Sequence, residues 1–316
     1  MTDSARSSFL SSEKLATTAE LLALGVSPDQ LRRLTRSGRA TPVGRGVYAP
    51  TAWLESMAGD PRRLHAVAVG AVIRRNPDLI ASHESAAYLH GLGLLLPAGT
   101  AAPLVTLTRR PRERSRALIR GALIRVAALP DEHLASALGV PVTTAARTVI
   151  DIARTTGFMA GVVAADSALR NQAAIKVDFA VVLGACAQWR GLVRARQVLD
   201  FCDGRAESAL ESVARVRFAE YGIRPPALQV NIRGRDGFIG RPDFCWHEYR
   251  TIAEADGALK YAEQGGARAR AQLARDEKFH DAGWATFHFT WGEIYREPGP
   301  TVERLRRTFA RAVRAR

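Results

Sequence analysis

The sequence predicts a mixed α/β (α+β) protein made of several separate segments. Along the 316 residues, stretches with apolar residues three and four positions apart, as in helices, are interspersed with short stretches in which apolar and polar residues alternate, as in strands. Glycine and proline interrupt these patterns at short intervals, which is typical of loops and element ends. Hydrophobic residues make up 47% and charged residues 24%, as in a globular rather than a disordered chain. The length is sufficient for two or three ordinary domains.

We expect five segments in order along the chain. Residues 12–50 combine short helical patterns with a glycine-punctuated hairpin, and residues 60–170 mix helices and strands. A helical connector covers 177–203, and an order of helix, strands, helix and strand covers 206–295. A basic helix over 302–316 ends the chain.

The first segment has the layout of a winged helix-turn-helix. A short helix over 17–24 is followed by Gly25, a left-handed stop. Ser27 then caps a second helix, with Pro28 at its first position and Asp29 at its positive end. In a helix-turn-helix, this second helix enters the major groove of DNA.

A wing follows the second helix. Ala40–Val43 is a short strand, Gly44-Arg45-Gly46 is a tight turn with a basic tip, and Val47-Tyr48 returns. Such a tip suits a phosphate or minor-groove contact. The alternative is a small helical subdomain with solvated arginines. On the winged-helix interpretation, the DNA-contacting residues are Ser27, Gln30, Arg32, Arg33, Arg36, Arg39 and Arg45.

The charge balance also favours a nucleic-acid partner. The formal net charge is +14, and only four of the 45 basic residues are lysines. One explanation is a polyanion-binding surface, since guanidinium groups match phosphate geometry. The other is a coding bias towards arginine on solvated faces. Bias explains arginine in place of lysine but not the surplus over acidic residues, so we expect double-stranded DNA as a partner.

The remaining composition favours a cytoplasmic protein without a membrane segment. No apolar run approaches the roughly 18 residues that span a bilayer. Residues 1–12 lack the apolar stretch of a secretory signal. Cys186, Cys202 and Cys245 are an odd number without a CxxC pair, which fits a reducing compartment rather than a disulfide framework.

Three stretches of the first half resemble AbiEi-type antitoxins of type IV toxin–antitoxin systems. Ala16–Pro50 is similar to their N-terminal domain, Ser82–Leu92 to a helix of their second domain, and Pro141–Asp151 to a later helix start. The resemblance implies promoter binding, repression of a partner operon and a cognate toxin protein. From the residues alone, His83 and His90 are structural or capping histidines, and Arg147 with Asp151 is a surface or partly buried ion pair.

The fourth segment places carboxylates on one face of a sheet. We expect a helix over Glu207–Phe218 and then strands over Leu228–Ile232, Phe238–Trp246 and Thr251–Asp256. If Trp246 pairs with Thr251, then Asp243 lies opposite Glu254, and Asp256 points to the same face. Clustered carboxylates repel unless a cation lies among them. Asp243, Glu254 and Asp256 are therefore candidate ligands of Mg²⁺ or Mn²⁺.

A helix over 266–282 and a strand over Trp284–Phe289 complete this segment. Pro242-Asp243 and Glu254-Ala255-Asp256, in this order of elements, resemble the PD-(D/E)XK nucleases, and within them the very-short-patch-repair-like endonucleases. The resemblance implies a restriction-endonuclease-like three-layer α/β/α core. The catalytic candidates are Glu211, Asp243, Glu254, Asp256 and Lys260.

One position departs from the PD-(D/E)XK pattern. Asp256 stands where the pattern has lysine. Either Lys260 supplies the cation from the following residues, or the domain keeps the fold without the chemistry. His288 is expected to be packed rather than catalytic. The terminal basic helix either binds the DNA backbone or docks on the domain through Leu305, Phe309 and Val313.

Two functions follow from these patterns. The first is a DNA-binding, antitoxin-like transcriptional regulator with a nuclease-fold C-terminal domain. The second is a divalent-metal-dependent DNA endonuclease targeted by its winged helix. An inert scaffold would leave the arginine-rich helix without a role. The sequence does not specify the oligomeric state, since no coiled-coil heptad is present.

Overall fold

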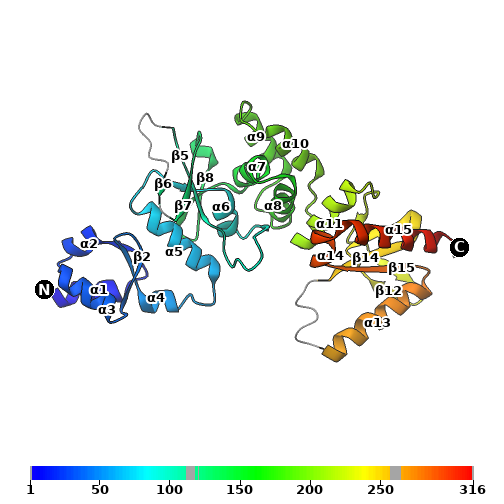
Figure 1. The fold of residues 1–316 in the computed structure, drawn as a ribbon, viewed down its shortest axis with the longest axis horizontal. Helices are drawn as coiled ribbons and strands as arrows, with labels where there is room; N and C mark the ends of the chain where they lie inside the picture. Colours follow the sequence, from blue (N-terminus) through cyan, green and yellow to red (C-terminus); the bar gives the residue numbers. More distant parts are fainter. Residues whose placement is uncertain (1, 112–117, 120, 257–264, 315–316) are drawn as a thin grey trace. The chain divides into compact units, whose positions relative to one another are not determined.

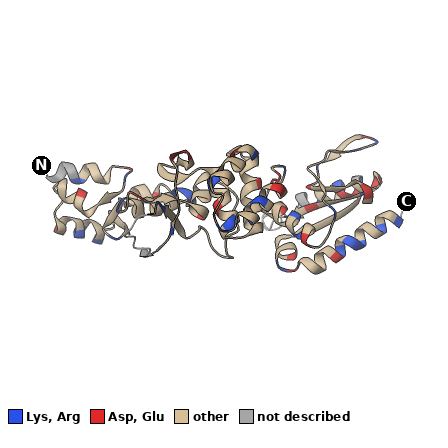
Figure 2. Ribbon diagram, turned by 90° about the horizontal axis from the view of Figure 1, so that it is seen from above, with Lys and Arg blue, Asp and Glu red and all other residues tan. Residues whose placement is uncertain are grey.

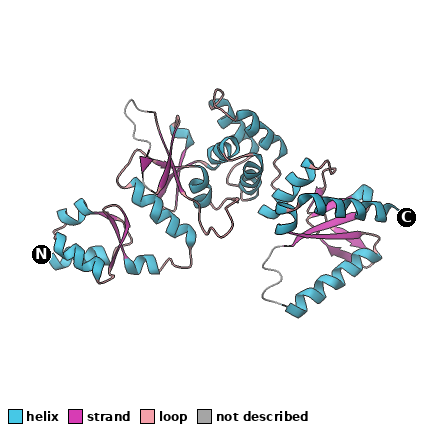
Figure 3. Cartoon of the chain, in the orientation of Figure 1, coloured by secondary structure: helices cyan, strands magenta, loops and turns pink. Residues whose placement is uncertain are grey.

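The computed structural model describes residues 2–111, 118–119, 121–256 and 265–314, so Lys260 lies outside the described residues (Figure 1). The chain divides into two compact units. The first unit comprises residues 1–155 and 173–192, and the second comprises residues 156–172 and 193–316. Both units contain helices and sheets, so the mixed α/β class is confirmed (Figure 3). No described helix is both long enough and apolar enough to cross a membrane.

The N-terminal part of the first unit joins helices to a small antiparallel sheet. The helices are α1 (Thr2–Leu10), α2 (Thr18–Ala23) and α3 (Pro28–Arg36). The strands β1 (Ala16–Thr17), β2 (Ala40–Gly44) and β3 (Val47–Pro50) form a sheet in the order β1-β3-β2. The sequence patterns did not predict α1. It forms because Phe9 is buried among Leu21, Val26 and Leu31.

The rest of the first unit is a larger mixed sheet in the order β6-β7-β5-β4-β9-β8. Its strands are β4 (Ile80–Ala81), β5 (Val105–Arg109), β6 (Leu118–Ile119), β7 (Ala122–Val126), β8 (Leu134–Ala137) and β9 (Val140–Thr143). The helices of this part are α4 (Thr51–Glu55), α5 (Pro61–Ile73), α6 (His83–His90), α7 (Ala145–Thr155) and α9 (Lys176–Ala185). Val69 of α5 and Leu89 of α6 are buried against Leu107 and Val142 of the sheet.

Arg147 and Asp151 of α7 correct an expectation. They form the predicted ion pair, with Nε and Oδ2 2.9 Å apart, but both side chains are completely buried. The Arg147 guanidinium also lies over the ring of Trp189, with Cζ 4.4 Å from the ring centroid. A buried charge needs a compensating partner, so each of the two side chains depends on the other to stay in the interior. The pair is therefore part of the core and not a surface ion pair.

The second unit contains a sheet in the order β10-β13-β14-β15. Its strands are β10 (Ala227–Leu228), β13 (Phe244–Trp246), β14 (Thr251–Asp256) and β15 (Ala285–Thr290), with a separate hairpin of β11 (Ile232–Gly234) and β12 (Gly237–Gly240). The helices are α8 (Phe158–Arg170), α10 (Leu192–Phe201), α11 (Ala209–Glu220), α13 (Gly265–Asp281), α14 (Trp291–Arg296) and α15 (Pro298–Arg314).

The two faces of this sheet have different cores. Phe279 of α13 clusters with Cys245 and Ile252 on one face. On the other face, Phe218 of α11 makes edge contacts with Phe244, with ring centroids 5.5 Å apart. Adjacent residues of one strand therefore serve opposite faces, as the alternation of the sequence predicts.

Two expected strands are broken in the structure. The stretch 228–232 divides into β10 and β11, and the stretch 238–246 divides into β12 and β13. Gln229 lies in the left-handed region at φ 55°. Pro242 has no backbone N–H to donate to a ladder. Between the broken strands, the side chains of Gln229 and Asp243 come within hydrogen-bonding distance of each other.

Two expected helices also differ in extent. The connector expected over 177–203 is two helices, α9 and α10, because residues 186–191 leave the helical conformation and Gly191 has φ +84°. The terminal helix begins at Pro298 rather than near residue 302. It docks on the unit, since Leu305 is completely buried and Phe309 stacks on Tyr249 with centroids 4.3 Å apart. Val313 stays 47% exposed.

Candidate functional site

The second helix of the N-terminal segment, α3, starts with a reciprocal cap. The Ser27 hydroxyl accepts a hydrogen bond from Gln30 N (3.2 Å), and Gln30 Oε1 accepts one from Ser27 N (2.7 Å). Leu31 and Leu34 are each 5% exposed and anchor the inner side of the helix. Two of the predicted DNA-contacting side chains, those of Ser27 and Gln30, therefore stabilise the start of the helix.

The outer side of α3 presents a basic hollow. Arg33, Arg36 and Arg39 are exposed and line a depression of about 490 Å³ together with Gln30. Arg6 of α1 also lines it. Arg6 was not among the predicted DNA-contacting residues, because α1 was not predicted. The three-residue spacing from Arg6 to Phe9 was the available signal. The blue segments of Figure 2 mark the basic residues along the chain. Converging guanidinium groups are suited to phosphate oxygens.

Two other predicted DNA residues have different surroundings. Arg32 forms an exposed i, i+3 ion pair with Asp29, which partly compensates its charge. Arg45 is exposed in the turn between β2 and β3, where Gly46 has φ +66°. The Arg45 carbonyl accepts a hydrogen bond from Arg75 Nη1 (2.9 Å), which fixes the turn while leaving the Arg45 side chain outside.

In the second unit, Gln229 joins two of the predicted catalytic carboxylates. Its Nε2 donates to Glu211 Oε2 (3.0 Å) and to Asp243 Oδ1 (3.1 Å). Asp243 Oδ2 also accepts from Ala255 N (2.8 Å). Burial, and secondarily the nearby Asp243 carboxylate, raises the pKa of Glu211. Sequence reasoning missed Gln229; no local motif marks it, and its left-handed backbone is visible only in the structure.

The other two predicted carboxylates lie on the α13 face of the sheet. The observed pairing of Trp246 with Thr251 and of Phe244 with Ala253 confirms the predicted hairpin register, although the ladder ends before Asp243. Glu254 Oε2 accepts from Arg275 Nη2 (2.7 Å). Asp256 Oδ2 lies 3.2 Å from His288 Nδ1, and His288 Nε2 lies 3.2 Å from Asp276 Oδ2.

These carboxylates do not present a ready ligand set for a metal ion. Glu254 is bound by the Arg275 guanidinium, Asp256 faces His288, and Asp243 accepts a backbone N–H. Within the described ranges, no three His, Cys, Asp or Glu side chains converge in a way that would hold an ion. The arrangement as it stands does not fit Mg²⁺ or Mn²⁺, which prefer several oxygen ligands around one centre.

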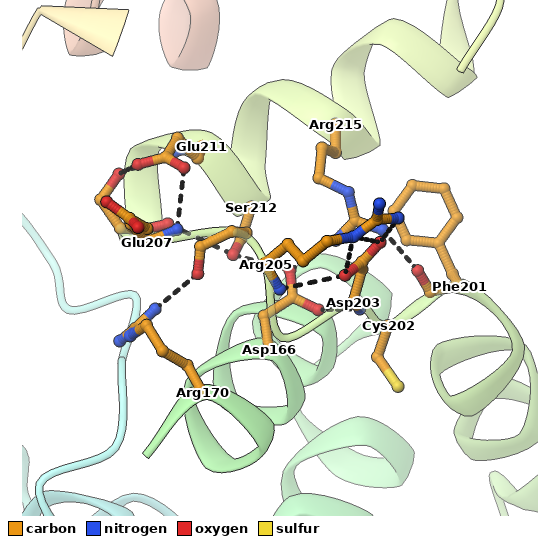
Figure 4. Close-up of polar contacts among 12 residues, drawn as sticks. Asp166, Arg170, Phe201, Cys202, Asp203, Arg205, Glu207, Glu211, Ser212 and Arg215 are labelled. Atoms are coloured by element: carbon orange, nitrogen blue, oxygen red, sulfur yellow. Dashed lines mark hydrogen bonds and ion pairs between the residues drawn. The ribbon is translucent and has the colours of Figure 1, made fainter. Parts of the chain in front are cut away.

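A buried polar network fixes α11, which carries Glu211 (Figure 4). Asp166 of α8 is completely buried and accepts from Arg215 Nη1 (2.6 Å) and Ser212 Oγ (2.8 Å). It also accepts from Asp203 N (2.7 Å), so α8, the end of α10 and α11 are joined. At the start of α11, Glu211 N donates to the Ser208 hydroxyl (3.1 Å).

The two histidines of the α6 motif have structural surroundings. His90 Nε2 lies 2.8 Å from the Thr143 carbonyl and joins α6 to β9. His83 Nδ1 lies 3.0 Å from the Ser82 hydroxyl. Burial lowers the pKa of His83 to about 4, so the ring is neutral near pH 7. These contacts agree with the structural role expected from the sequence.

Residues 7–51 match a protein family described as "Transcriptional regulator, AbiEi antitoxin". The match supports a transcriptional-regulator or antitoxin role for the N-terminal segment. The chain is also 33% identical over 170 residues to two proteins of Mycobacterium tuberculosis, Rv2248 of strain H37Rv and MT2308 of strain CDC 1551, both described as uncharacterized. The aligned region is 54% of this chain and 62% of each relative, so the chain spans less than two thirds of these relatives.

Proposed function

We propose that the protein is a sequence-specific DNA-binding regulator of the antitoxin type, whose N-terminal segment is a winged helix-turn-helix. The observation that carries the proposal is the basic hollow on α3, lined by Arg6, Arg33, Arg36 and Arg39. The helix that carries it is capped at Ser27 and anchored by Leu31, which gives the arginines a rigid support.

The arrangement of this segment supports DNA contact at two places. The arginines of α3 reach the groove and its phosphates, and Arg45 in the turn after β2 reaches a neighbouring phosphate or the minor groove. Arg75 holds that turn through the Arg45 carbonyl. On this proposal the further partner is a cognate toxin protein, and the protein acts in the cytoplasm.

The first test replaces Arg33, Arg36 and Arg39 together by alanine and measures DNA affinity by fluorescence anisotropy over a range of salt concentrations. We expect affinity to fall by about 10- to 100-fold at low salt, because the variant loses phosphate contacts. Each lost contact should also lower the slope of log affinity against log salt concentration by about one unit. The matched control replaces three exposed arginines elsewhere, Arg190, Arg196 and Arg235. Equal losses in both triple variants would reduce the effect to net charge and contradict the proposal.

A second candidate function is phosphodiester hydrolysis by the C-terminal domain with Mg²⁺ or Mn²⁺. The observation that favours it is the pairing of Glu211 and Asp243 through Gln229, between α11 and the start of β13. The Arg275–Glu254 ion pair opposes it, since the Arg275 guanidinium already neutralises the Glu254 carboxylate. We therefore rank this function below DNA binding.

The second test incubates supercoiled and linear DNA with the full chain and Mn²⁺, beside Asp243→Ala and Asp236→Ala. Asp236 is an exposed turn residue and serves as the matched control. On the regulator proposal, neither wild type nor the variants cut DNA. Cleavage that requires the ion, persists in Asp236→Ala and disappears in Asp243→Ala would establish the nuclease instead.

A further inference from the structure

A hollow of about 560 Å³ lies beside α5 within the first unit. One wall is a single face of α5, whose contributing residues are separated by helical spacings: Arg63, Ala66, Val67, Gly70, Ile73 and Arg74. The other walls come from Trp53 of α4, from Met57 just after α4, from Leu15 before β1, and from the turn between β8 and β9. Its volume is within the range of pockets that hold small organic molecules.

The lining of this hollow combines an apolar body with cationic groups. Leu15, Trp53, Met57 and Val67 provide apolar surface. The charged residues at the hollow are three cations, Lys14, Arg63 and Arg74, and one carboxylate, Glu13. Arg74 is bound to Glu20, whereas none of the ion pairs found among the described residues involves Arg63. The surplus of positive charge suits a ligand with a single anionic group.

Leu138 adds an exposed apolar side chain to this lining. It lines the hollow from the turn between β8 and β9, and its backbone has φ 49°. An apolar L-residue is uncommon in the left-handed region, where glycine or asparagine is favoured. Leu138 is nevertheless 47% exposed, so no core packing explains its side chain. Gly139, the next residue, has φ +74°, and Ala137 pairs with Val140, so the two residues form a type I′ turn that accounts for the Leu138 backbone. The turn presents the leucine side chain to the hollow.

The same helix and its C-cap residue Arg74 contact the N-terminal segment that carries α2, α3 and the β2–β3 turn. Arg74 Nη2 donates to Glu20 Oε1 (2.6 Å), while Glu20 Oε2 accepts from Thr17 N (2.8 Å) in the cap of α2. At Gly44 in β2, an added Cβ would lie 3.3 Å from the Ala71 side chain, so α5 approaches the wing closely. A ligand against α5 would therefore act on both α2 and the β2–β3 turn of the N-terminal segment.

We propose that this hollow binds a small organic acid with an apolar body, and that its occupancy changes the affinity of the N-terminal segment for DNA. The ligand's apolar part lies between α4 and the inner face of α5, and Arg63 and Lys14 receive its acid group. Leu138 covers the apolar part. The effect on DNA rests on the proposed function, whereas ligand binding does not.

The test uses 1-anilinonaphthalene-8-sulfonate, an aromatic body with one anionic group, as a fluorescent probe, and decanoate as its competitor. Three variants of the full chain are compared with wild type: Arg63→Glu, Leu138→Asn and, as a matched control, Arg190→Glu. Asparagine tolerates positive φ, so Leu138→Asn is expected to fold at least as stably as wild type. Circular dichroism and thermal unfolding check that each variant is folded.

We expect saturable probe binding that decanoate displaces, about tenfold weaker in Arg63→Glu and in Leu138→Asn and unchanged in Arg190→Glu. Saturating decanoate should change the DNA dissociation constant of wild type by about fivefold or more, and that ratio should approach one in Arg63→Glu. Absence of saturable binding, or binding that both hollow variants leave unchanged, would overturn the site. Binding without any change in DNA affinity would overturn its regulatory role. Arg63-dependent binding by a protein that shifts no DNA would leave the ligand site standing and refute the proposed function.

Discussion

At the scale of single residues, His288 shows how the acidic face of the second unit is neutralised. Its two ring nitrogens each lie 3.2 Å from a carboxylate oxygen, one of Asp256 and one of Asp276. The hydrogen bond to Asp256 raises the pKa of His288, with Asp276 and Glu254 adding to the effect and burial opposing it. When His288 is protonated, its ring lies between two carboxylates and offsets their negative charge.

This pKa shift predicts a pH-dependent contribution to stability. Because the folded-state pKa is raised, the stabilisation is complete below the unfolded value of about 6.5 and is lost as pH rises through the folded value. We expect His288→Gln to lower the free energy of unfolding most at pH 5.5 to 6 and progressively less towards pH 9. Urea unfolding at a series of pH values measures this difference. A difference that stays constant with pH would show that His288 contributes only packing.

At the scale of elements, α11 is positioned by a charge that water cannot reach. Asp166 is completely buried and Arg215 is 11% exposed, yet they form one short ion pair with two further donors to the carboxylate. Removing one partner of such a pair leaves the other charge uncompensated, which typically costs about 3–5 kcal/mol. Losing the pair would therefore destabilise the packing of α8, α10 and α11 and not the sheet.

We therefore expect Asp166→Ala to lower the free energy of unfolding by about 3 kcal/mol or more. The exposed Asp200→Ala on α10 is the control and should change it by less than about 0.5 kcal/mol. Urea unfolding followed by circular dichroism measures both. If the two variants were equally stable, Asp166 would have to be compensated in another way.

Other elements show which features of the fold follow from sequence patterns. The cap of α3, the α13 helix and the hairpin register around Trp246 were predictable, because each depends on neighbouring residues or on a counted turn. The α1 helix and the breaks at Gln229 and Pro242 were not. They depend on packing and hydrogen bonds between residues distant in sequence, such as Gln229 with Glu211. The shared face of Glu254 and Asp256 was predictable, because residues two apart in a strand point to the same side. The Arg275 guanidinium beside Glu254 was not predictable, because the two residues are distant in sequence.

At the scale of the whole molecule, the question is which of the two units binds DNA. The net charge of +14 favours DNA anywhere on a basic surface, but the proposed function assigns specific binding to the first unit. A ligand stabilises the region that binds it, by about 2.7 kcal/mol at a concentration 100 times its dissociation constant. Local protection from hydrogen exchange reports that stabilisation by position.

We expect DNA at saturating concentration to slow amide exchange in residues 27–48, which cover α3, β2 and the first half of β3, and to leave exchange in residues 241–256 unchanged. Hydrogen exchange measured by mass spectrometry on the full chain, with and without Mn²⁺, distinguishes the two units. The Arg33, Arg36 and Arg39 triple variant should lose the protection in the first stretch. Protection confined to 241–256 would instead assign DNA to the acidic face beside α13, where only a cation could offset the repulsion between its carboxylates and phosphate.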